Sequence, residues 1–303
     1  MQVTKTMKNN APMSLNQLKK TSDKKTANHI KKTTSNQINT TDVKLYSVQN
    51  LQFLLFNGPD MISQQLRSGQ YWEVATVQTM QHFLSNIAQP IFIDIGANLG
   101  SISIPIGKFI QSRNGQVFSF EAQRGVYYQL CGNIFANNLI NTCTAYHYAI
   151  SNQQGEIQIP VLNLSLEANV GSLSLDEDIR KQQHTLSTTP TAYENVQMKR
   201  IDDFDLPPAS LIKIDVEGLE LEVLEGAENY IKKSNYPPIF FEIWGDYMKD
   251  LIPKREKLMS FIEKSLGYKT AILGELCIAQ HPNNRYFDII STENGTLSMN
   301  RLK

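Results

Sequence analysis

The sequence predicts an α/β fold in which a doubly wound, mostly parallel sheet carries helices on both faces. Two observations lead to this prediction. From residue 91 onward, short apolar runs alternate with segments whose apolar residues recur at helical spacing. In addition, the first apolar run, residues 91–95, leads directly into a glycine-rich turn. Such a turn is typical of the point where a strand of a doubly wound sheet passes into its helix.

The alternation predicts five strands and four helices in the core, with two strands after them. The expected core strands are residues 91–95, 116–121, 144–150, 211–215 and 239–243. The expected helices are residues 101–111, 126–137, 219–232 and 253–266. The final strands are expected at residues 269–272 and 286–291.

Three regions lie outside this alternation. Residues 1–42 lack aromatic residues, and their first forty positions carry eight lysines against one acidic residue, so we expect a disordered basic tail. Residues 43–90 predict two short strands and then helices, forming an N-terminal cap on the cofactor-binding core, residues 91–245. The whole domain would span residues 43–303. Residues 152–200 form a polar insertion, for which a lid and a surface loop both stay open.

The composition bounds the class of protein. Lys and Arg total 29, as do Asp and Glu, so the chain as a whole gives no strong nucleic-acid signal. The three cysteines are isolated, which favours a reducing compartment, and no apolar run is long enough to predict a membrane span. A cytoplasmic protein is therefore expected, and its oligomeric state stays open.

The glycine-rich turn has the pattern Asp94-x-Gly96-x-Asn98-x-Gly100. We expect its backbone N–H groups to face a ligand. A dinucleotide fingerprint needs glycine where Asn98 stands and a third glycine that is absent here. The acidic Asp94 would repel a diphosphate but would attract a cationic amine. The turn therefore favours a sulfonium cofactor that bears an amino acid over a dinucleotide.

Two further segments complete the expected cofactor site. Glu121 ends the second strand, where an acid can accept hydrogen bonds from both ribose hydroxyls of a nucleoside. By itself such an acid is as readily a helix cap, but beside the glycine turn we expect the ribose role. Ala149 and Ile150 end the third expected strand, and their position in the fold places them where backbone contacts frame an adenine.

A third motif runs from Lys213 to Ala227, Lys-Ile-Asp-Val-Glu-Gly-Leu-Glu-Leu-Glu-Val-Leu-Glu-Gly-Ala. Together with Asp94–Gly100 and Phe120-Glu121-Ala122, it resembles the FkbM family of S-adenosylmethionine-dependent methyltransferases. The resemblance covers roughly residues 90–245, and every fixed position of the third family motif is matched. One departure is Ala122, where proline is usual. It should loosen the turn after Glu121 but keeps the carboxylate.

The resemblance implies a Rossmann-like fold, S-adenosylmethionine as the cofactor, and methyl transfer to a small-molecule or glycan acceptor. That acceptor is most often a hydroxyl of a sugar, lipid or natural product, and its proton must be removed by a base. Asp215 and Glu217, at the end of the fourth strand, and Glu242, at the end of the fifth, are the expected catalytic groups.

Several alternatives stay open. Glu217 could instead cap a helix that begins at Gly218, and the three acids could together hold a divalent cation, although no metal ligand is assigned. Lys213 is expected to pack its stem along a strand edge rather than to act as a catalytic amine. The whole chain could also be a non-catalytic binding protein on the same fold, or an RNA methyltransferase that uses its basic tail.

Overall fold

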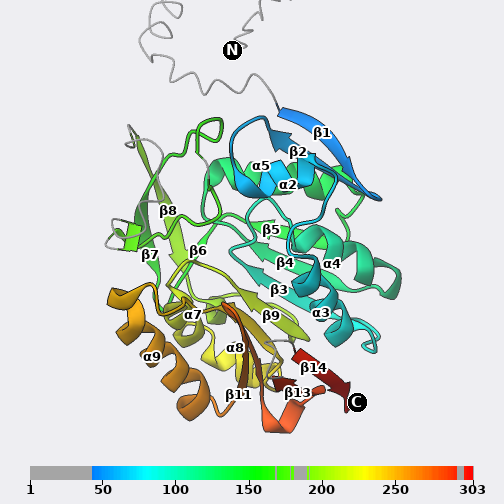
Figure 1. Cartoon of the computed structure of the whole chain (residues 1–303), viewed down its shortest axis with the longest axis vertical. Helices are drawn as coiled ribbons and strands as arrows, with labels where there is room; N and C mark the ends of the chain where they lie inside the picture. Colours follow the sequence, from blue (N-terminus) through cyan, green and yellow to red (C-terminus); the bar gives the residue numbers. More distant parts are fainter. Residues whose placement is uncertain are drawn as a thin grey trace, which may run out of the picture. The chain divides into compact units, whose positions relative to one another are not determined.

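The structure, a computed structural model, describes residues 43–167, 169–177, 179–180, 190, 192–291 and 297–302 (Figure 1). The chain divides into two units, residues 1–40 and 41–303, and the described residues all belong to the second. The expected basic tail, residues 1–42, lies outside the described residues.

A mostly parallel sheet forms the centre of the described unit. Among the described residues its strand order is β11-β12-β10-β9-β3-β4-β5. The bounds are β3 Ile91–Ile95, β4 Gln116–Phe120, β5 Cys143–Tyr146, β9 Leu211–Ile214, β10 Ile239–Glu242, β11 Lys269–Leu273 and β12 Leu276–Gln280. The first five of these pair in parallel, whereas β12 is antiparallel to both β10 and β11. All five residues of β3 are buried, as expected for a central strand covered on both faces.

Helices cover both faces of this sheet, which confirms the predicted doubly wound fold. Successive side chains of a strand point to opposite faces. Phe92 and Leu211 pack into one core with α3 (Val74–Leu84), α4 (Ser103–Ile110) and α5 (Arg124–Ala136). Their neighbours Ile93 and Ile212 pack into a second core. This core holds α7 (Glu220–Glu225), α8 (Glu228–Lys233) and α9 (Ile252–Ser260).

A hairpin and two helices precede the sheet, where the sequence predicted strands and helices. The hairpin consists of β1 (Val43–Val48) and β2 (Leu51–Phe56), and α2 spans Met61–Arg67. The outer edge of β2 is covered by α5. Asn133 Oδ1 accepts from Leu54 N at 2.6 Å, and Asn137 Oδ1 accepts from Gln52 N at 2.9 Å. Spaced one helical turn apart, the two amides take the place of a neighbouring strand.

The helix predicted over residues 219–232 is wrong in one respect, because it is broken into α7 and α8. Gly226 lies at the break. A Cβ at this position would lie 2.0 Å from the carbonyl oxygen of Ser151, so the close packing of residues 151–152 against the break requires glycine here. The predicted helix over residues 253–266 is α9 followed by a π-helical turn, Phe261–Ser265.

The strands predicted over residues 144–150 and 286–291 also differ from the structure. The first divides into β5 and β6 (Ala149–Ile150), and β6 joins a separate sheet with β8 (Tyr193–Lys199) and β7 (Gly155–Pro160). The second is β13 (Phe287–Ser291), which pairs with β14 (Leu297–Arg301) outside the central sheet. Between β11 and β13 along the chain lies β12, which also enters the central sheet and was not predicted.

Short 3-10 turns connect several elements, at Gln111–Arg113, Ile201–Asp203, Lys249–Leu251 and Pro282–Asn284. None of the helices in the described part of the chain is both long and apolar enough to cross a membrane.

Candidate active site

A cavity of about 690 Å³ lies at the carboxyl ends of β3, β4, β9 and β10. The segments that line it come from the turn after β3, the start of α5, β6, the loop after β9 and the loop after β10. Residues 169–175 of the insertion and residues 72–80 at the start of α3 also contribute. This is the edge at which an open α/β sheet presents its ligand site.

The glycine turn adopts a conformation that explains its residue pattern. Gly96, Asn98 and Gly100 have positive φ angles of 77°, 50° and 93°. Asparagine is among the few residues that tolerate the left-handed region, so Asn98 can stand where a dinucleotide motif has glycine. Gly96 has a further constraint, since a Cβ there would lie 1.7 Å from the carbonyl oxygen of Asp215.

The backbone N–H groups of this turn do not face a ligand, so that expectation was wrong. Each of them donates within the protein. Gly96 N and Ala97 N donate to Phe120 O (both 3.0 Å), Asn98 N to Glu121 Oε2 (2.9 Å), Leu99 N to Asn98 Oδ1 (2.6 Å) and Gly100 N to Ala97 O (3.0 Å). A phosphate cradle needs free donors. The turn therefore does not suit a dinucleotide, in agreement with the cofactor class expected from the sequence.

Glu121 holds the turn from the end of β4. Its carboxylate accepts from Asn98 N and, at 2.8 Å, from the backbone N–H of Gln123, which precedes α5. Burial, only partly offset by these hydrogen bonds, raises the pKa of Glu121 to about 7. Each carboxylate oxygen has further lone pairs, and the residue lines the cavity. The capping contact and the expected ribose contact are thus compatible.

A buried ion cluster lies beneath the turn. Asp94 and Lys213 are paired neighbours in the register of β3 and β9. The Lys213 ammonium lies 3.4 Å from Asp94 Oδ1 and 3.1 Å from Asp215 Oδ2, and it donates to the carbonyl oxygen of Gly96 at 3.0 Å. Burial lowers the pKa of Lys213, but the carboxylates of Asp215 and Asp94 more than offset it, so the net pKa is raised. The expectation of a stem packed along an edge was wrong.

Asp94 itself has no exposed surface, and its Oδ2 accepts from Ser103 Oγ at 2.5 Å. Among the predicted cofactor-binding residues, Gly96, Asn98, Glu121, Ala149 and Ile150 line the cavity. Asp94 and Gly100 are not among the residues that line it. The structure thus places Asp94 behind the turn, where it contacts Lys213 instead of the cavity.

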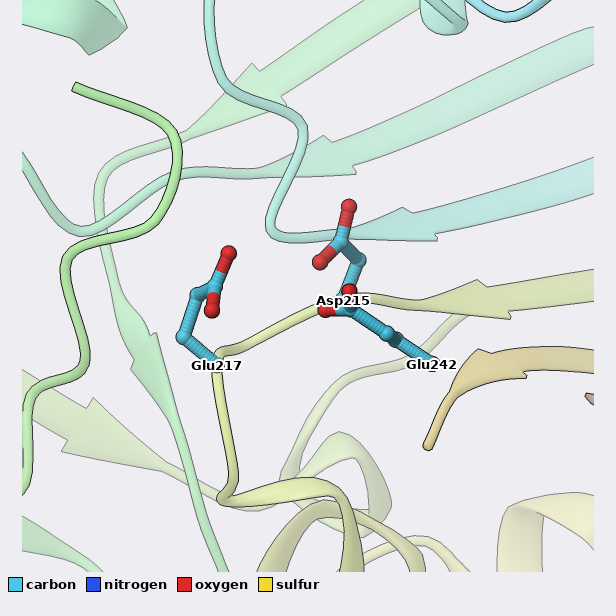
Figure 2. A group of neighbouring side chains, drawn as sticks. All are labelled: Asp215, Glu217 and Glu242. Atoms are coloured by element: carbon cyan, nitrogen blue, oxygen red, sulfur yellow. The ribbon is translucent and has the colours of Figure 1, made fainter. Parts of the chain in front are cut away.

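The three predicted catalytic acids come together on the other side of the cavity. Asp215, Glu217 and Glu242 extend from the ends of β9 and β10 and from the loop after β9 (Figure 2). One carboxylate oxygen from each lies within 4.8 Å of the others, and all three side chains are half-buried. Burial, together with the negative charges of Asp215, Glu220 and Glu275, raises the pKa of Glu242 to about 9.

The loop that carries Glu217 has an unusual backbone. Glu217 and Gly218 have φ angles of 54° and 94°. Glu220 Oε1 accepts from the N–H groups of Val216 and Gly218 at 3.1 and 3.2 Å, which secures the loop. The capping alternative required a helix that begins at Gly218, directly after Glu217. Helix α7 begins only at Glu220, so Glu217 does not occupy the capping position. Left-handed non-glycine residues cost free energy and cluster at functional sites.

Other lining residues were not assigned to the site from the sequence. Glu73 accepts from Trp72 Nε1 at 3.1 Å, and Glu275 accepts from the Tyr247 hydroxyl at 2.5 Å. Glu275 precedes β12, so its place depends on an unpredicted strand. Part of the insertion also reaches the cavity, since a Cβ on Gly171 would lie 2.9 Å from Asn98 Nδ2.

Comparisons with known proteins bear on this site. Residues 94–270 match the model of the methyltransferase FkbM domain. The structure is similar to the methyltransferase FkbM from Methylobacillus flagellatus, with 15% identity and a TM-score of 0.42 over 63% of this chain and 43% of that chain. It is also similar to a precorrin-6y C5,15-methyltransferase from Geobacter metallireducens, with 13% identity and a TM-score of 0.41 over 76% of this chain and 94% of that chain.

A third similar structure is an O-methyltransferase from Bacillus cereus in complex with SAH, with 12% identity and a TM-score of 0.41 over 69% of this chain and 80% of that chain. This chain spans less than half the length of the Methylobacillus protein described above. No curated protein matches the sequence significantly. Because the family model covers more than half of the chain, this protein belongs to the FkbM methyltransferase family, and its cofactor is S-adenosylmethionine.

Proposed function

We propose that this methyltransferase transfers the methyl group of S-adenosylmethionine to a hydroxyl oxygen of a sugar, glycan, lipid or natural product. The observation that carries the proposal is the placement of Asp215, Glu217 and Glu242 in the same cavity as the glycine turn and Glu121. A methyl donor and a hydroxyl acceptor can lie side by side in such a cavity, with carboxylates beside the hydroxyl.

The side of the cavity formed by the glycine turn, Glu121, Ala149 and Ile150, here called the turn side, fits the cofactor. Glu121 would accept hydrogen bonds from the ribose hydroxyls, and Ala149 and Ile150 would frame the adenine. Gly96 and Asn98 would lie along the amino-acid part. When bound, the cofactor supplies a methyl group activated by a sulfonium. The acids in the cavity favour that positive charge, and the fully engaged N–H groups of the turn disfavour a diphosphate.

The acceptor hydroxyl must lose its proton as its oxygen attacks the methyl carbon. The O–C bond forms while the C–S bond breaks, and the proton passes to a carboxylate. Asp215 is a poor choice for this base, since its oxygen already lies 3.1 Å from the Lys213 ammonium and protonation would break that ion pair. Glu242 is the better choice, because its raised pKa of about 9 lies closer to the pKa of an alcohol than that of an ordinary carboxyl does.

Calorimetric titration with S-adenosylhomocysteine, followed by transfer of labelled methyl from S-adenosylmethionine to panels of glycans, lipids and peptides, tests the proposal. We expect S-adenosylhomocysteine to bind with a submillimolar dissociation constant. We also expect the labelled methyl group of the product to be attached to an oxygen atom. Absence of binding would exclude the methyltransferase activity, and label on nitrogen or carbon would exclude the hydroxyl acceptor. Glu242→Gln should keep the binding and lose the turnover.

A further inference from the structure

An exposed apolar surface is shared by the β1–β2 hairpin and α5. None of its residues lines the cavity. The exposed fractions of its side chains reach 75% at Phe135, 64% at Tyr128 and 55% at Leu45. We call it the outer apolar surface, and it consists of Val43, Leu45, Leu54, Tyr128 and Phe135. Single exposed apolar side chains are ordinary, so what needs an explanation is that these five adjoin one another.

The hairpin and the helix bring these side chains together. The two β1 residues point to the same side of the strand, since they are two positions apart. Leu45 is paired with Leu54 in the register of the hairpin. A Cβ on Gly132 would lie 2.7 Å from Leu54 Cδ1, so this leucine lies against α5. Tyr128, Gly132 and Phe135 share one face of the helix, and the surface is therefore continuous from β1 to α5.

The charges around this surface have one sign. Residues 43–59, which include β1 and β2, contain neither Asp nor Glu, and the same holds for residues 122–155, which include α5. Residues 1–40, which precede β1 in the chain, carry eight lysines against one acidic residue. The chain itself thus tethers these lysines to the outer apolar surface, which begins at Val43. A partner with both apolar and anionic groups would complement the two.

We propose that the outer apolar surface binds the surface of an anionic lipid membrane, and that the lysines of residues 1–40 bind its headgroups. This inference goes beyond the proposed function and does not depend on it. Aromatic and aliphatic side chains enter the boundary between headgroups and acyl chains, where apolar atoms leave water. Lysines are attracted to anionic headgroups. Stable attachment to a membrane commonly needs two such signals, and this chain carries both.

Two other occupants fit the surface less well. Two copies of the chain paired through it would bring together two sets of eight lysines, which repel each other. A nucleic acid would neutralise the lysines, but its backbone would leave the valine and leucine side chains exposed to water. An anionic membrane complements the lysines and the apolar side chains at once.

Sedimentation of the full chain with vesicles tests this inference. Equimolar phosphatidylcholine and phosphatidylserine vesicles are compared with pure phosphatidylcholine vesicles, without cofactor or acceptor, so the result is independent of the proposed function. We expect the anionic vesicles to bind about tenfold more tightly or better, and the difference to shrink as salt is added. Absence of binding to the anionic vesicles would overturn the inference.

Variants in the full chain separate the two signals. Phe135→Ser should weaken binding to the anionic vesicles about tenfold, and Phe135→Trp should keep it. Ile290→Ser is the matched control, because Ile290 is 51% exposed on β13, which lies at the opposite end of the described unit from β1 (Figure 1). It should change nothing. Replacement of the eight lysines by glutamine should abolish the preference for anionic vesicles. Equal losses in Phe135→Ser and Ile290→Ser would contradict a role of this surface.

Two further measurements test the other occupants. Thermal unfolding of each variant first shows that its fold is kept. Light scattering then gives the mass of the full chain and of Phe135→Ser, and a dimer that this change converts to a monomer would assign the surface to a second copy. Binding to polyuridylate in place of anionic vesicles, unchanged in Phe135→Ser, would assign the lysines to RNA. Either outcome would overturn the inference, whereas a monomer that binds anionic vesicles through Phe135 supports it.

Discussion

The two sides of the cavity are stabilised in different ways. On the turn side, each N–H group from Gly96 to Gly100 has an acceptor within the protein, and the Glu121 carboxylate accepts from the backbone N–H groups of Asn98 and Gln123. On the acid side, Asp215, Glu217 and Glu242 crowd together with one basic lining residue, Lys213, among those described. The N–H groups of the turn side are thus satisfied within the protein, whereas on the acid side burial and like charges raise the pKa of Glu242.

The largest expected effect on stability comes from a substitution that disrupts the turn side sterically. Gly96→Ala places a Cβ 1.7 Å from the carbonyl oxygen of Asp215 at a φ of 77°, and backbone on both sides must move. We expect a loss of stability of about 4 kcal/mol or more, measured by chemical denaturation. Gly69→Ala is the control, since its φ is 83° but nothing lies within 4 Å, and it should cost only about 1 kcal/mol. Equal costs would refute the steric account.

The next largest effect is expected when Lys213, the cation that joins the two sides, is removed. Lys213→Met leaves the buried carboxylate of Asp94 without its ion pair, and we expect a loss of about 3–5 kcal/mol in the free energy of unfolding. The double variant Lys213→Met/Asp94→Asn removes both charges and should recover much of the loss. If the double variant were as unstable as the sum of its single changes, the ion pair would not be the cause.

A smaller effect concerns cofactor affinity on the turn side. Glu121→Gln should weaken binding of S-adenosylhomocysteine about 10- to 100-fold, since hydrogen bonds to a charged acceptor are lost. Thermal unfolding of the unliganded variant controls for loosening of the turn. An unchanged dissociation constant would refute the ribose role.

The pH dependence of the same titration is a separate check. Because the ligand needs the ionised carboxylate of Glu121, protons compete with it, and affinity should fall as the pH drops below about 7. Glu121→Gln should show a flatter profile over this range.

An effect of similar size is expected in the pH profile on the acid side. With a pKa of about 9, Glu242 is mostly protonated at pH 7, so turnover by this base should rise as the pH increases from 7 towards 9. The slope should approach about tenfold per pH unit at the lower end. Initial rates at saturating cofactor measure it. A rate that is flat over this range would assign the base to another group.

Much of the fold and of the candidate site could be predicted from local sequence patterns. The parallel strands β3, β4, β9 and β10 lie within two residues of the predicted ends, because continuous apolar runs bounded by turns are a local signal. All three predicted catalytic acids line one cavity, since the carboxyl ends of parallel strands meet at one edge. Strand β12 and the break at Gly226 escaped prediction, because each depends on a distant partner.

The sequence by itself determined the order of the parallel strands β3, β4, β9 and β10, the glycine-rich turn at Gly96–Gly100 and the acids at the ends of β4, β9 and β10. These follow from apolar periodicity, backbone sterics and chain position. Only the tertiary structure decided that Lys213 lies opposite Asp94, that the turn satisfies its own N–H groups, and that Glu73 and Glu275 join the cavity. Strand register and long-range packing bring these groups together, and neither is encoded in the spacing of residues along one segment.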